Sequence, residues 1–307
     1  MGKECYPSAM GWSAVGVDVG GTKIRAARVV DGRVVGETFR ATPPDDPTMV
    51  MGAITDAAAG VHDGRCPIGV GTAGQVDRHH GVVLTSPNLP GRNVPLGAAL
   101  EEAFSVPVVV DNDVRLAAVG EWLALGGEPG VLVALYVGTG VGAGVVLGGR
   151  VLAGVNNLAT EAGHATFRSG GELCGCGRRG CFEAYAGGRP VVERLARRIG
   201  SGQEAPVHVG GVVELAERGD PAAREVWEEA VEAIRTLAWN LVVLYDPAAL
   251  VLGGGVVRGV PELAGTIREH VAAQVWSGFL QPRVVVGSPD AAVTGAAYTA
   301  WKEHERG

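Results

Sequence analysis

The sequence predicts an α/β fold in which one arrangement of β-strands occurs twice. Apolar runs alternate with helical patterns along the first half of the chain, which is typical of α/β proteins. A glycine-rich hairpin near the N-terminus also returns later in the chain with the same order of residues. We therefore expect two related halves, each built around its own sheet.

Residues 14–35 predict the first hairpin. Valine occupies every second position from 15 to 19, the turn Gly-Gly-Thr-Lys follows at 20–23, and a second apolar run ends at Asp31-Gly32. An Asp-Gly pair between apolar runs is a strong signal for a tight hairpin turn.

The same construction returns 117 positions later, where Gly138-Thr139 matches Gly21-Thr22. The match indicates a duplicated unit, although two unrelated glycine-rich hairpins would also produce a match this short. Each turn offers backbone N–H groups that no side chain obstructs, and such groups suit phosphate oxygens. Two phosphate-binding turns predict a nucleotide in a cleft between two lobes.

The other expected elements follow from apolar periodicity and from helix signals. In the first half we expect buried strands at 68–70 and 106–110, with helices at 49–61 and 114–125. The part after Glu183 is mainly helical, with a helix from Asp220-Pro221 to about Tyr245, a strand at 249–252 and a final helix at 291–303.

Composition and charge limit the classes of function. The 307 residues are 47% apolar and 19% charged, as in a globular protein large enough for two domains. The net charge of −7, without a basic stripe, argues against nucleic acid as a partner. The N-terminus has no continuous apolar core, and the most apolar stretch, 237–257, is interrupted by polar residues and glycines. We therefore expect no signal peptide and no membrane span, and place the protein in the cytoplasm.

Three of the five cysteines, Cys174, Cys176 and Cys181, lie close together and follow His164. One imidazole and three thiolates form a closed tetrahedral zinc site, which favours a structural metal over a hydrolytic one. In a reducing compartment the clustering favours a metal over a disulfide. The alternative is three reduced structural cysteines near an unrelated histidine.

Two carboxylates flank this cluster, because Glu161 lies just before His164 and Glu183 lies two residues after Cys181. Carboxylates and histidine nitrogens can hydrogen-bond vicinal hydroxyls, which predicts a polyhydroxy ligand. Glu183 taken alone is equally well explained as an acid at a helix N-terminus, where the helix dipole favours it.

The run Val-Val-Val-Asp-Asn-Asp at 108–113 is the second signal for chemistry. A buried strand with acids at its carboxyl end lies where open α/β sheets bind ligands. Phosphoryl transfer needs a carboxylate that accepts the proton of the attacking hydroxyl, and Asp113 is the candidate. Taken alone, these residues would equally cap the helix that begins at Val114.

Asp18 precedes the glycine-rich turn at 20–23 by two residues. A carboxylate beside a phosphate-binding turn can hold Mg²⁺, directly or through water. The turn is not a Walker motif, because the glycine and lysine spacing of a P-loop is absent.

These residues resemble the ROK family of repressors, open reading frames and kinases, in particular its bacterial glucokinase-like sugar kinases. The resemblance covers nearly the whole chain. Its motifs are Asp18-Val-Gly-Gly-Thr-Lys23, Ser86-Pro-Asn-Leu-Pro-Gly91, Asn112-Asp113, Gly138-Thr-Gly-Val-Gly142, Glu161-Ala-Gly-His164 and Cys174-Gly-Cys-Gly-Arg-Arg-Gly-Cys-Phe-Glu183. The last motif is highly specific to the family.

The resemblance implies an actin-like, ribonuclease-H-like kinase fold with duplicated β-sheet domains and two lobes that close on a sugar in the cleft between them. It implies a small α/β lobe over residues 1–118, rejoined by a C-terminal helix at 291–307. The large α/β lobe, with the zinc-binding loop, would cover residues 119–290. A homodimer or homotetramer is the expected assembly.

The resemblance further implies ATP-dependent phosphorylation of a hexose at its 6-hydroxyl, with glucose favoured and with Asp113 as the catalytic base. The hexose would be bound by Gly74, Asn88, Asn112, Asp113, Glu161, His164 and Glu183. ATP would be bound by Gly20, Gly21, Thr22, Lys23, Gly138, Thr139, Gly140, Gly142 and Gly254. Asp18 would hold Mg²⁺, and His164 would contact Zn²⁺ with one nitrogen and the sugar with the other.

Some positions depart from the usual glucokinase pattern. Of these, Gln75, Arg115 and Thr160 can lie near the sugar, so the exact hexose stays open. The main alternative is therefore a kinase for an amino sugar such as kanosamine, glucosamine or N-acetylmannosamine.

Two further alternatives are more remote. Relatives that use polyphosphate in place of ATP generally lack the cysteine motif. A sugar-responsive regulator without kinase activity needs a helix-turn-helix segment, and we expect none in the short stretch before the first strand.

Overall fold

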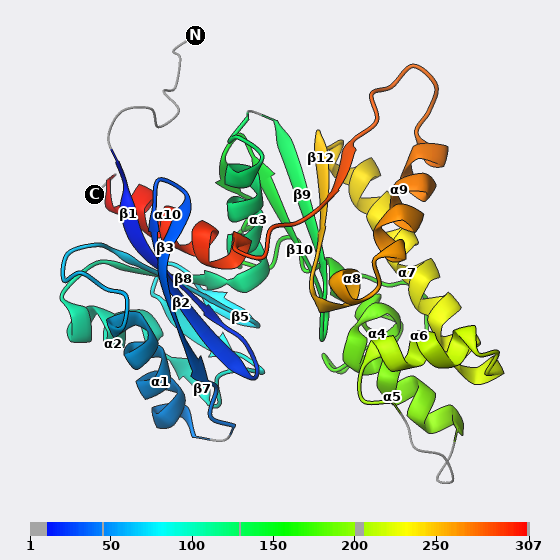
Figure 1. Cartoon of the computed structure of the whole chain (residues 1–307), viewed down its shortest axis with the longest axis horizontal. Coiled ribbons are helices and arrows are strands. Elements are labelled where there is room, and N and C mark those ends of the chain that lie inside the picture. Colours follow the sequence, from blue (N-terminus) through cyan, green and yellow to red (C-terminus); the bar gives the residue numbers. More distant parts are fainter. Residues whose placement is uncertain (1–10, 45, 129, 200–205, 306–307) are drawn as a thin grey trace. The chain divides into compact units, whose positions relative to one another are not determined.

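The computed structural model describes residues 11–44, 46–128, 130–199 and 206–305 (Figure 1). The chain divides into two compact units. The first comprises Met1–Gly130, Gly144–Ala159 and Ser288–Gly307, and the second comprises Val131–Ala143 and Thr160–Gly287. Residues 1–10 and 306–307 of the predicted small lobe lie outside the described residues. The lobe boundaries inferred from the resemblance stay a prediction.

The first unit is built on a five-stranded sheet of order β3-β2-β1-β4-β8. Its strands are β1 (Ser13–Val19), β2 (Lys23–Val30), β3 (Arg33–Ala41), β4 (Ile68–Thr72) and β8 (Val108–Asn112). The predicted hairpin is confirmed, since β1 and β2 pair antiparallel. Asp31 and Gly32 both have positive φ, 48° and 78°, as a two-residue turn between β2 and β3 requires.

In its described residues, the first unit also contains a smaller sheet and four helices. A three-stranded sheet consists of β5 (Gln75–Asp77), β6 (Val82–Thr85) and β7 (Arg92–Val94). The helices are α1 (Pro47–Ala59), α2 (Leu96–Phe104), α3 (Asp113–Ala124) and α10 (Ala291–His304). The C-terminal helix α10, red in Figure 1, packs against α3, β1 and β4.

The core of the first unit fixes where its parallel strands end. Val70 and Val110 are fully buried, as expected for strands that are covered on both faces. The register places Val19 opposite Thr72 and Thr72 opposite Asn112. The carboxyl ends of β1, β4 and β8 therefore meet at one edge of the sheet.

A second five-stranded sheet has the order β11-β10-β9-β12-β13. Its strands are β9 (Val131–Val137), β10 (Val141–Leu147), β11 (Arg150–Val151), β12 (Ala249–Gly253) and β13 (Arg283–Val286). In this sheet the consecutive strands β9, β10 and β11 are neighbours, and β12 and β13 follow β9 in parallel. The first sheet has the same order, with β1, β2 and β3 as neighbours and with β4 and β8 parallel to β1. This repetition supports the duplication inferred from the two glycine-rich turns.

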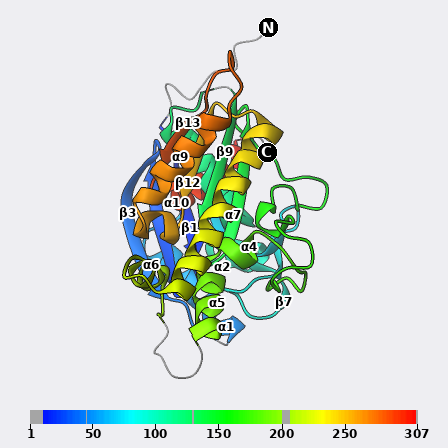
Figure 2. The same ribbon diagram turned by 90° about the vertical axis from the view of Figure 1, so that its right-hand side faces the viewer.

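The second unit is mainly helical after Glu183, as predicted. Its helices are η1 (Ala162–His164), α4 (Glu183–Ala186), α5 (Gly188–Ile199), α6 (Val209–Glu217), α7 (Pro221–Tyr245), α8 (Gly255–Gly259) and α9 (Glu262–Gln274). The long helix α7 begins where Asp220 Oδ1 accepts a hydrogen bond from the Ala223 N–H at 2.8 Å. Figure 2 shows α7 and α9 side by side, and α7 packs against β9 while α9 packs against β13. Among the described residues, no helix is both long and apolar enough to cross a membrane.

Candidate functional site

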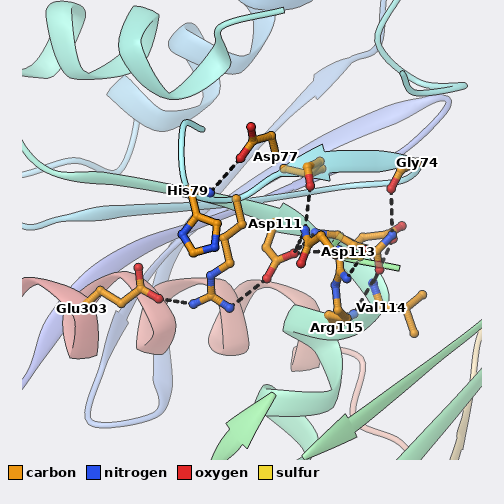
Figure 3. Close-up of polar contacts among 12 residues, drawn as sticks. Gly74, Asp77, His79, Asp111, Asp113, Val114, Arg115 and Glu303 are labelled. Atoms are coloured by element: carbon orange, nitrogen blue, oxygen red, sulfur yellow. Dashed lines mark hydrogen bonds and ion pairs between the residues drawn. The ribbon is translucent and has the colours of Figure 1, made fainter. Parts of the chain in front are cut away.

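Asn112 is the last residue of β8 and Asp113, which is labelled in Figure 3, is the first residue of α3. Asn112 is the N-cap residue of α3, because its Oδ1 accepts hydrogen bonds from the backbone N–H groups of Val114 at 3.0 Å and Arg115 at 3.2 Å. Asp113 is the first residue of the helix, and its Oδ1 accepts from the Val114 N–H at 2.9 Å. Asn112 therefore supplies the cap, and the Asp113 carboxylate lies at the positive end of the helix dipole.

Two glycines allow the backbone to approach this junction closely. Asn112 Nδ2 donates to the carbonyl oxygen of Gly74 at 3.3 Å. Gly74 has a φ of 99°, and a Cβ there would lie 2.2 Å from the carbonyl oxygen of Thr85, so the position requires glycine. Gly71 on β4 also lies close to Asp113, since a Cβ on Gly71 would be 3.2 Å from Asp113 Cα. The structure thus brings Gly74, Asn112 and Asp113 together, and adds Gly71, which no local sequence pattern predicted.

The first glycine-rich turn lies next to Asn88. The backbone N–H of Gly20 donates to the carbonyl oxygen of Lys23 at 3.1 Å, which closes the turn between β1 and β2. Asn88 Nδ2 donates to the carbonyl oxygen of Val19 at 2.9 Å, and a Cβ on Gly21 would lie 3.1 Å from Asn88 Oδ1. The predicted sugar ligand Asn88 and the predicted phosphate turn therefore share one end of β1.

Asp18 lies on β1 opposite Arg25 of β2. Burial raises the pKa of the Asp18 carboxyl, although the nearby charges of Arg25 and Lys23 act in the opposite direction. A partly buried carboxylate beside a phosphate-binding turn is a suitable ligand for a divalent cation. The Lys23 ammonium lies 4.6 Å from the centroid of the Phe39 ring, where it makes a cation–π contact.

The donor atoms of His164, Cys174, Cys176 and Cys181, here called the His–Cys cluster, all lie within 4.8 Å of one another. The Sγ atoms of Cys176 and Cys181 are 3.7 Å apart, and Cys174 Sγ is 3.7 Å from His164 Nδ1. Two thiolates on one tetrahedral Zn²⁺ lie about 3.8 Å apart, because each Zn–S bond is about 2.3 Å long. The predicted ligands therefore come together at distances that fit a closed zinc site.

The pKa shifts of Cys174 and Cys181 argue against activated nucleophiles. Burial raises the pKa of the Cys174 thiol to about 12 and also raises the pKa of Cys181. For Cys176, partial burial acts upward, but hydrogen bonds from the Arg178 backbone and from the two neighbouring thiols lower its pKa. Buried thiols of this kind stay protonated at neutral pH unless a cation binds them as thiolates. The cluster therefore suits metal binding rather than nucleophilic catalysis.

Glu183 connects the His–Cys cluster to the second glycine-rich turn. Its Oε1 lies 3.6 Å from Cys174 Sγ and 4.0 Å from His164 Nδ1. Its Oε2 accepts a hydrogen bond from the Val141 N–H at 3.0 Å. A Cβ on Gly140 would lie 2.4 Å from the same oxygen, so this contact depends on glycine in the turn. Glu161 lies on the other side of His164 in the chain, and its carbonyl oxygen accepts from the His164 N–H at 3.0 Å.

The second glycine-rich turn joins β9 to β10. The Gly138 N–H donates to the carbonyl oxygen of Gly140 at 3.0 Å. A Cβ on Gly138 would lie 3.8 Å from the backbone nitrogen of Gly255, directly after the end of β12. The structure thus groups five predicted nucleotide ligands around the ends of β9 and β12 and the start of β10: Gly138, Thr139, Gly140, Gly142 and Gly254.

One group of polar residues next to Asp113 was not predicted. Asp111 is fully buried, and it lies between the guanidinium groups of Arg78 and Arg115. Arg115, which the sequence analysis considered a neighbour of the sugar, has a buried side chain that donates to the carbonyl oxygen of Asn157. The spacing of Asp111 and Arg115, four residues apart, was the only local signal for this network.

Comparison with known proteins decides the family. The model of the ROK family matches residues 14–303. This chain belongs to the ROK family. It is similar to the ROK hexokinase from Thermus thermophilus, with 35% identity, a TM-score of 0.81 and coverage of 96% of this chain and 100% of the other.

Two other members are similar over most of their length. The ROK family glucokinase from Streptomyces griseus, solved with glucose and AMPPNP, is 32% identical, with a TM-score of 0.78 and coverage of 94% of this chain and 99% of the other. The N-acetylmannosamine kinase of Yersinia pseudotuberculosis is 33% identical over 261 residues, which are 84% of this ROK chain and 87% of that protein. The ROK chain therefore has the actin-like sugar kinase fold that the sequence motifs implied.

Proposed function

We propose that this ROK protein is an ATP-dependent hexose kinase that phosphorylates glucose at its 6-hydroxyl. The observation that carries the proposal is the position of Asp113 at the first turn of α3, beside Asn112, Gly74 and Gly71 at the carboxyl ends of the parallel strands β4 and β8. Open α/β sheets bind their ligands at the carboxyl ends of their strands. The similarity to a glucokinase solved with glucose and AMPPNP supports both the sugar and the nucleotide.

In the proposed reaction, the carboxylate of Asp113 accepts the proton of the 6-hydroxyl as that oxygen attacks the γ-phosphorus of ATP. The bond between this phosphorus and the bridging oxygen breaks, and ADP leaves with the electron pair. The other hydroxyls of the hexose are held by the predicted ligands Gly74, Asn88, Asn112, Glu161, His164 and Glu183. Their main contribution is to fix the reacting oxygen in line with the phosphate.

The backbone N–H groups of the two glycine-rich turns, with Gly254, are the proposed ligands of the ATP phosphates. Asp18 would hold the Mg²⁺ ion that accompanies ATP and neutralises its phosphate charge. The position of Asp18 on β1, just before the turn at 20–23, supports this assignment.

The His–Cys cluster would hold a structural Zn²⁺ ion. The ion would fix the loop around the cysteines and, through it, the start of α4 where Glu183 lies. Since His164 Nδ1 faces the thiols, its Nε2 would be directed to a substrate hydroxyl.

An amino-sugar kinase is the second candidate. The similarity to an N-acetylmannosamine kinase supports it, because that protein matches this chain as well in identity as the glucokinase does. The substrates of the two activities differ at one carbon of the hexose ring, in its substituent and for N-acetylmannosamine also in its configuration, and substrate kinetics separate them.

The experiment is a substrate screen with ATP and Mg²⁺, read by the coupled release of ADP, in which Asp113→Asn is the inactive control. The sugars are glucose, mannose, glucosamine, kanosamine and N-acetylmannosamine. We expect the highest kcat/KM with glucose. A higher value with an amino sugar would replace glucose by that sugar, and turnover with polyphosphate but not ATP would overturn the nucleotide assignment. No phosphorylation of any sugar would refute a kinase.

We further propose a cytoplasmic homodimer or homotetramer. Trp276, Phe279 and Leu280 of the second unit are largely exposed, and apolar side chains of this size gathered at a surface support an interface between subunits. Light scattering coupled to gel filtration measures the mass directly, and a monomer at micromolar concentration would contradict the proposal.

A further inference from the structure

Asp111 is a fully buried carboxylate that contacts two arginines immediately before the proposed catalytic residues (Figure 3). Its Oδ2 accepts a hydrogen bond from Arg78 Nη1 at 3.1 Å, and its Oδ1 lies 3.0 Å from Arg115 Nη2. The backbone N–H of Asn112 also donates to Oδ1, at 2.7 Å. The carboxylate therefore connects both guanidinium groups to the residue that caps α3.

Arg115 also reaches a segment that is distant in sequence. Its Nη1 donates to the carbonyl oxygen of Asn157 at 2.7 Å. Asn157 has a φ of 57°, and its Nδ2 donates to the carbonyl oxygen of Val76 at 2.6 Å and to Asp111 Oδ1 at 3.4 Å. The chain continues from Asn157 to the proposed sugar ligand Glu161 within four residues. Through its hydrogen bond to Asn157, Arg115 thus connects the β8–α3 junction with the segment that precedes Glu161 in the chain.

Stability alone is a poor explanation for a guanidinium at this place. The Arg115 side chain is 2% exposed, and its Nε has no hydrogen-bond partner among the described residues. A buried charge with an unsatisfied nitrogen is costly, and a well-packed apolar side chain often stabilises a fold at least as well as a buried ion pair. Arg78 is different, because its side chain is 20% exposed and it also pairs with Glu303 of α10.

We infer that Arg115 is a positioning residue for the kinase reaction: it holds Asn112 and Asp113 against Asn157, which belongs to the same unit and precedes Glu161 in the chain. The inference rests on the proposed function. Arg115 acts through Asp111 and Asn157 and contacts neither substrate. A displacement of about 1 Å in reacting groups can reduce the rate by roughly 100-fold. Loss of the contacts made by Arg115 should therefore change the rate measurably.

The test compares Arg115→Met with Arg78→Met. Both variants remove one guanidinium from the same buried carboxylate, but only Arg115 contacts Asn157. We expect Arg115→Met to lower kcat/KM for the hexose by roughly 10- to 100-fold with little change in the KM for ATP. Arg78→Met should lower the Tm with little effect on either constant. Equal kinetic losses in the two variants, in proportion to their loss of Tm, would overturn the inference.

Arg115→Lys serves as the conservative variant and replaces Arg115→Met if that variant does not fold. Lysine keeps a cation beside Asp111, but a single ammonium cannot reproduce the planar fork that reaches both Asp111 and Asn157. It should restore the Tm more completely than kcat/KM. Full recovery of both would show that only the charge matters and would contradict positioning.

A second readout is independent of activity. In the segment around Asn157, the Ala159 N–H donates a hydrogen bond to the carbonyl oxygen of Ala153 at 3.0 Å. Hydrogen exchange at this amide reports how often that hydrogen bond opens. Peptides covering 152–161 should exchange faster in Arg115→Met than in wild type or Arg78→Met. If the wild type phosphorylates no sugar, the proposed function fails, and this exchange comparison alone decides the role of Arg115: equal exchange in all three proteins would reject it.

Discussion

Glu183 accepts a hydrogen bond of 3.0 Å from the backbone N–H of Val141 through its Oε2 atom. Its Oε1 atom faces the His–Cys cluster instead, 3.6 Å from Cys174 Sγ. One carboxylate therefore connects the cluster with the glycine-rich turn that we propose binds phosphate. A change in the position of the turn or of the His–Cys cluster should therefore displace Glu183 and alter the other.

Gly140→Ala tests this connection. The new Cβ would lie 2.4 Å from Glu183 Oε2, which must then move away from Val141. We expect kcat/KM to fall by at least ~10-fold, because a displaced ligand no longer orients the substrate. Steady-state kinetics and thermal unfolding measure the two effects.

The matched control is Gly265→Ala on α9, where an added Cβ meets nothing within 4 Å. It should leave activity unchanged and increase the free energy of unfolding by about 0.5–1 kcal/mol, since alanine is the better helix former. Wild-type kinetics in Gly140→Ala would mean that Glu183 plays no part in the reaction.

Metal analysis of protein purified without chelator should find about one zinc ion per chain, as a closed set of three thiolates and one imidazole predicts. Cys176→Ser removes one ligand and should lose the metal and lower the Tm. Cys66→Ser is the comparison, because Cys66 lies in the first unit, in a separate group with His62 and Asp63 that could also hold a metal ion. Wild-type protein free of zinc, or equal zinc content in both variants, would count against the metal site.

Asp113→Asn tests the catalytic base. Asparagine keeps the side-chain oxygen that accepts from the Val114 N–H at 2.9 Å, so the helix should begin as before. It cannot accept the hydroxyl proton, and kcat should fall by at least ~10²-fold, the lower end for a positioned acid–base group. An unchanged Tm with near-wild-type kcat would show that Asp113 serves the helix alone.

Asp63 should make the stability of the first unit sensitive to acid. Partial burial acts to raise its pKa, but the backbone N–H groups of Cys66 and Arg65 and the Arg28 guanidinium hold the pKa down at about 2, from an ordinary value of 3.8. A carboxyl with a lowered pKa stabilises the fold above pH 3.8 and loses that contribution as the pH falls toward 2.

Asp63→Asn should therefore reduce the free energy of unfolding by about 1 kcal/mol at pH 7, a value discounted for the partly exposed site. The difference from wild type should shrink steadily below pH 4. Denaturant unfolding at a series of pH values measures it, and a difference that does not change with pH would exclude the ionised carboxylate as its cause.

The sequence by itself determined the features that depend on neighbouring residues. The turn at Asp31-Gly32 and the helix from Asp220 to Tyr245 were both predicted and found. The first needs two residues that tolerate positive φ, and the second needs an N-cap followed by proline. The donors of the His–Cys cluster lie within one short loop, so their spacing was enough to predict that they meet.

Only the tertiary structure decided which distant side chains meet. Asp111 and Arg115 are four residues apart, a spacing visible in the sequence, yet the partner of Arg115 is Asn157, 42 residues further along. The short strands β5 and β7 gave too few positions for a periodic pattern. Backbone preferences are set within a few residues, whereas the burial of a charge is set by strand register and by where a loop returns. A local stretch of sequence does not contain those energies, so the sequence did not predict that Arg115 is buried against Asp111 and Asn157.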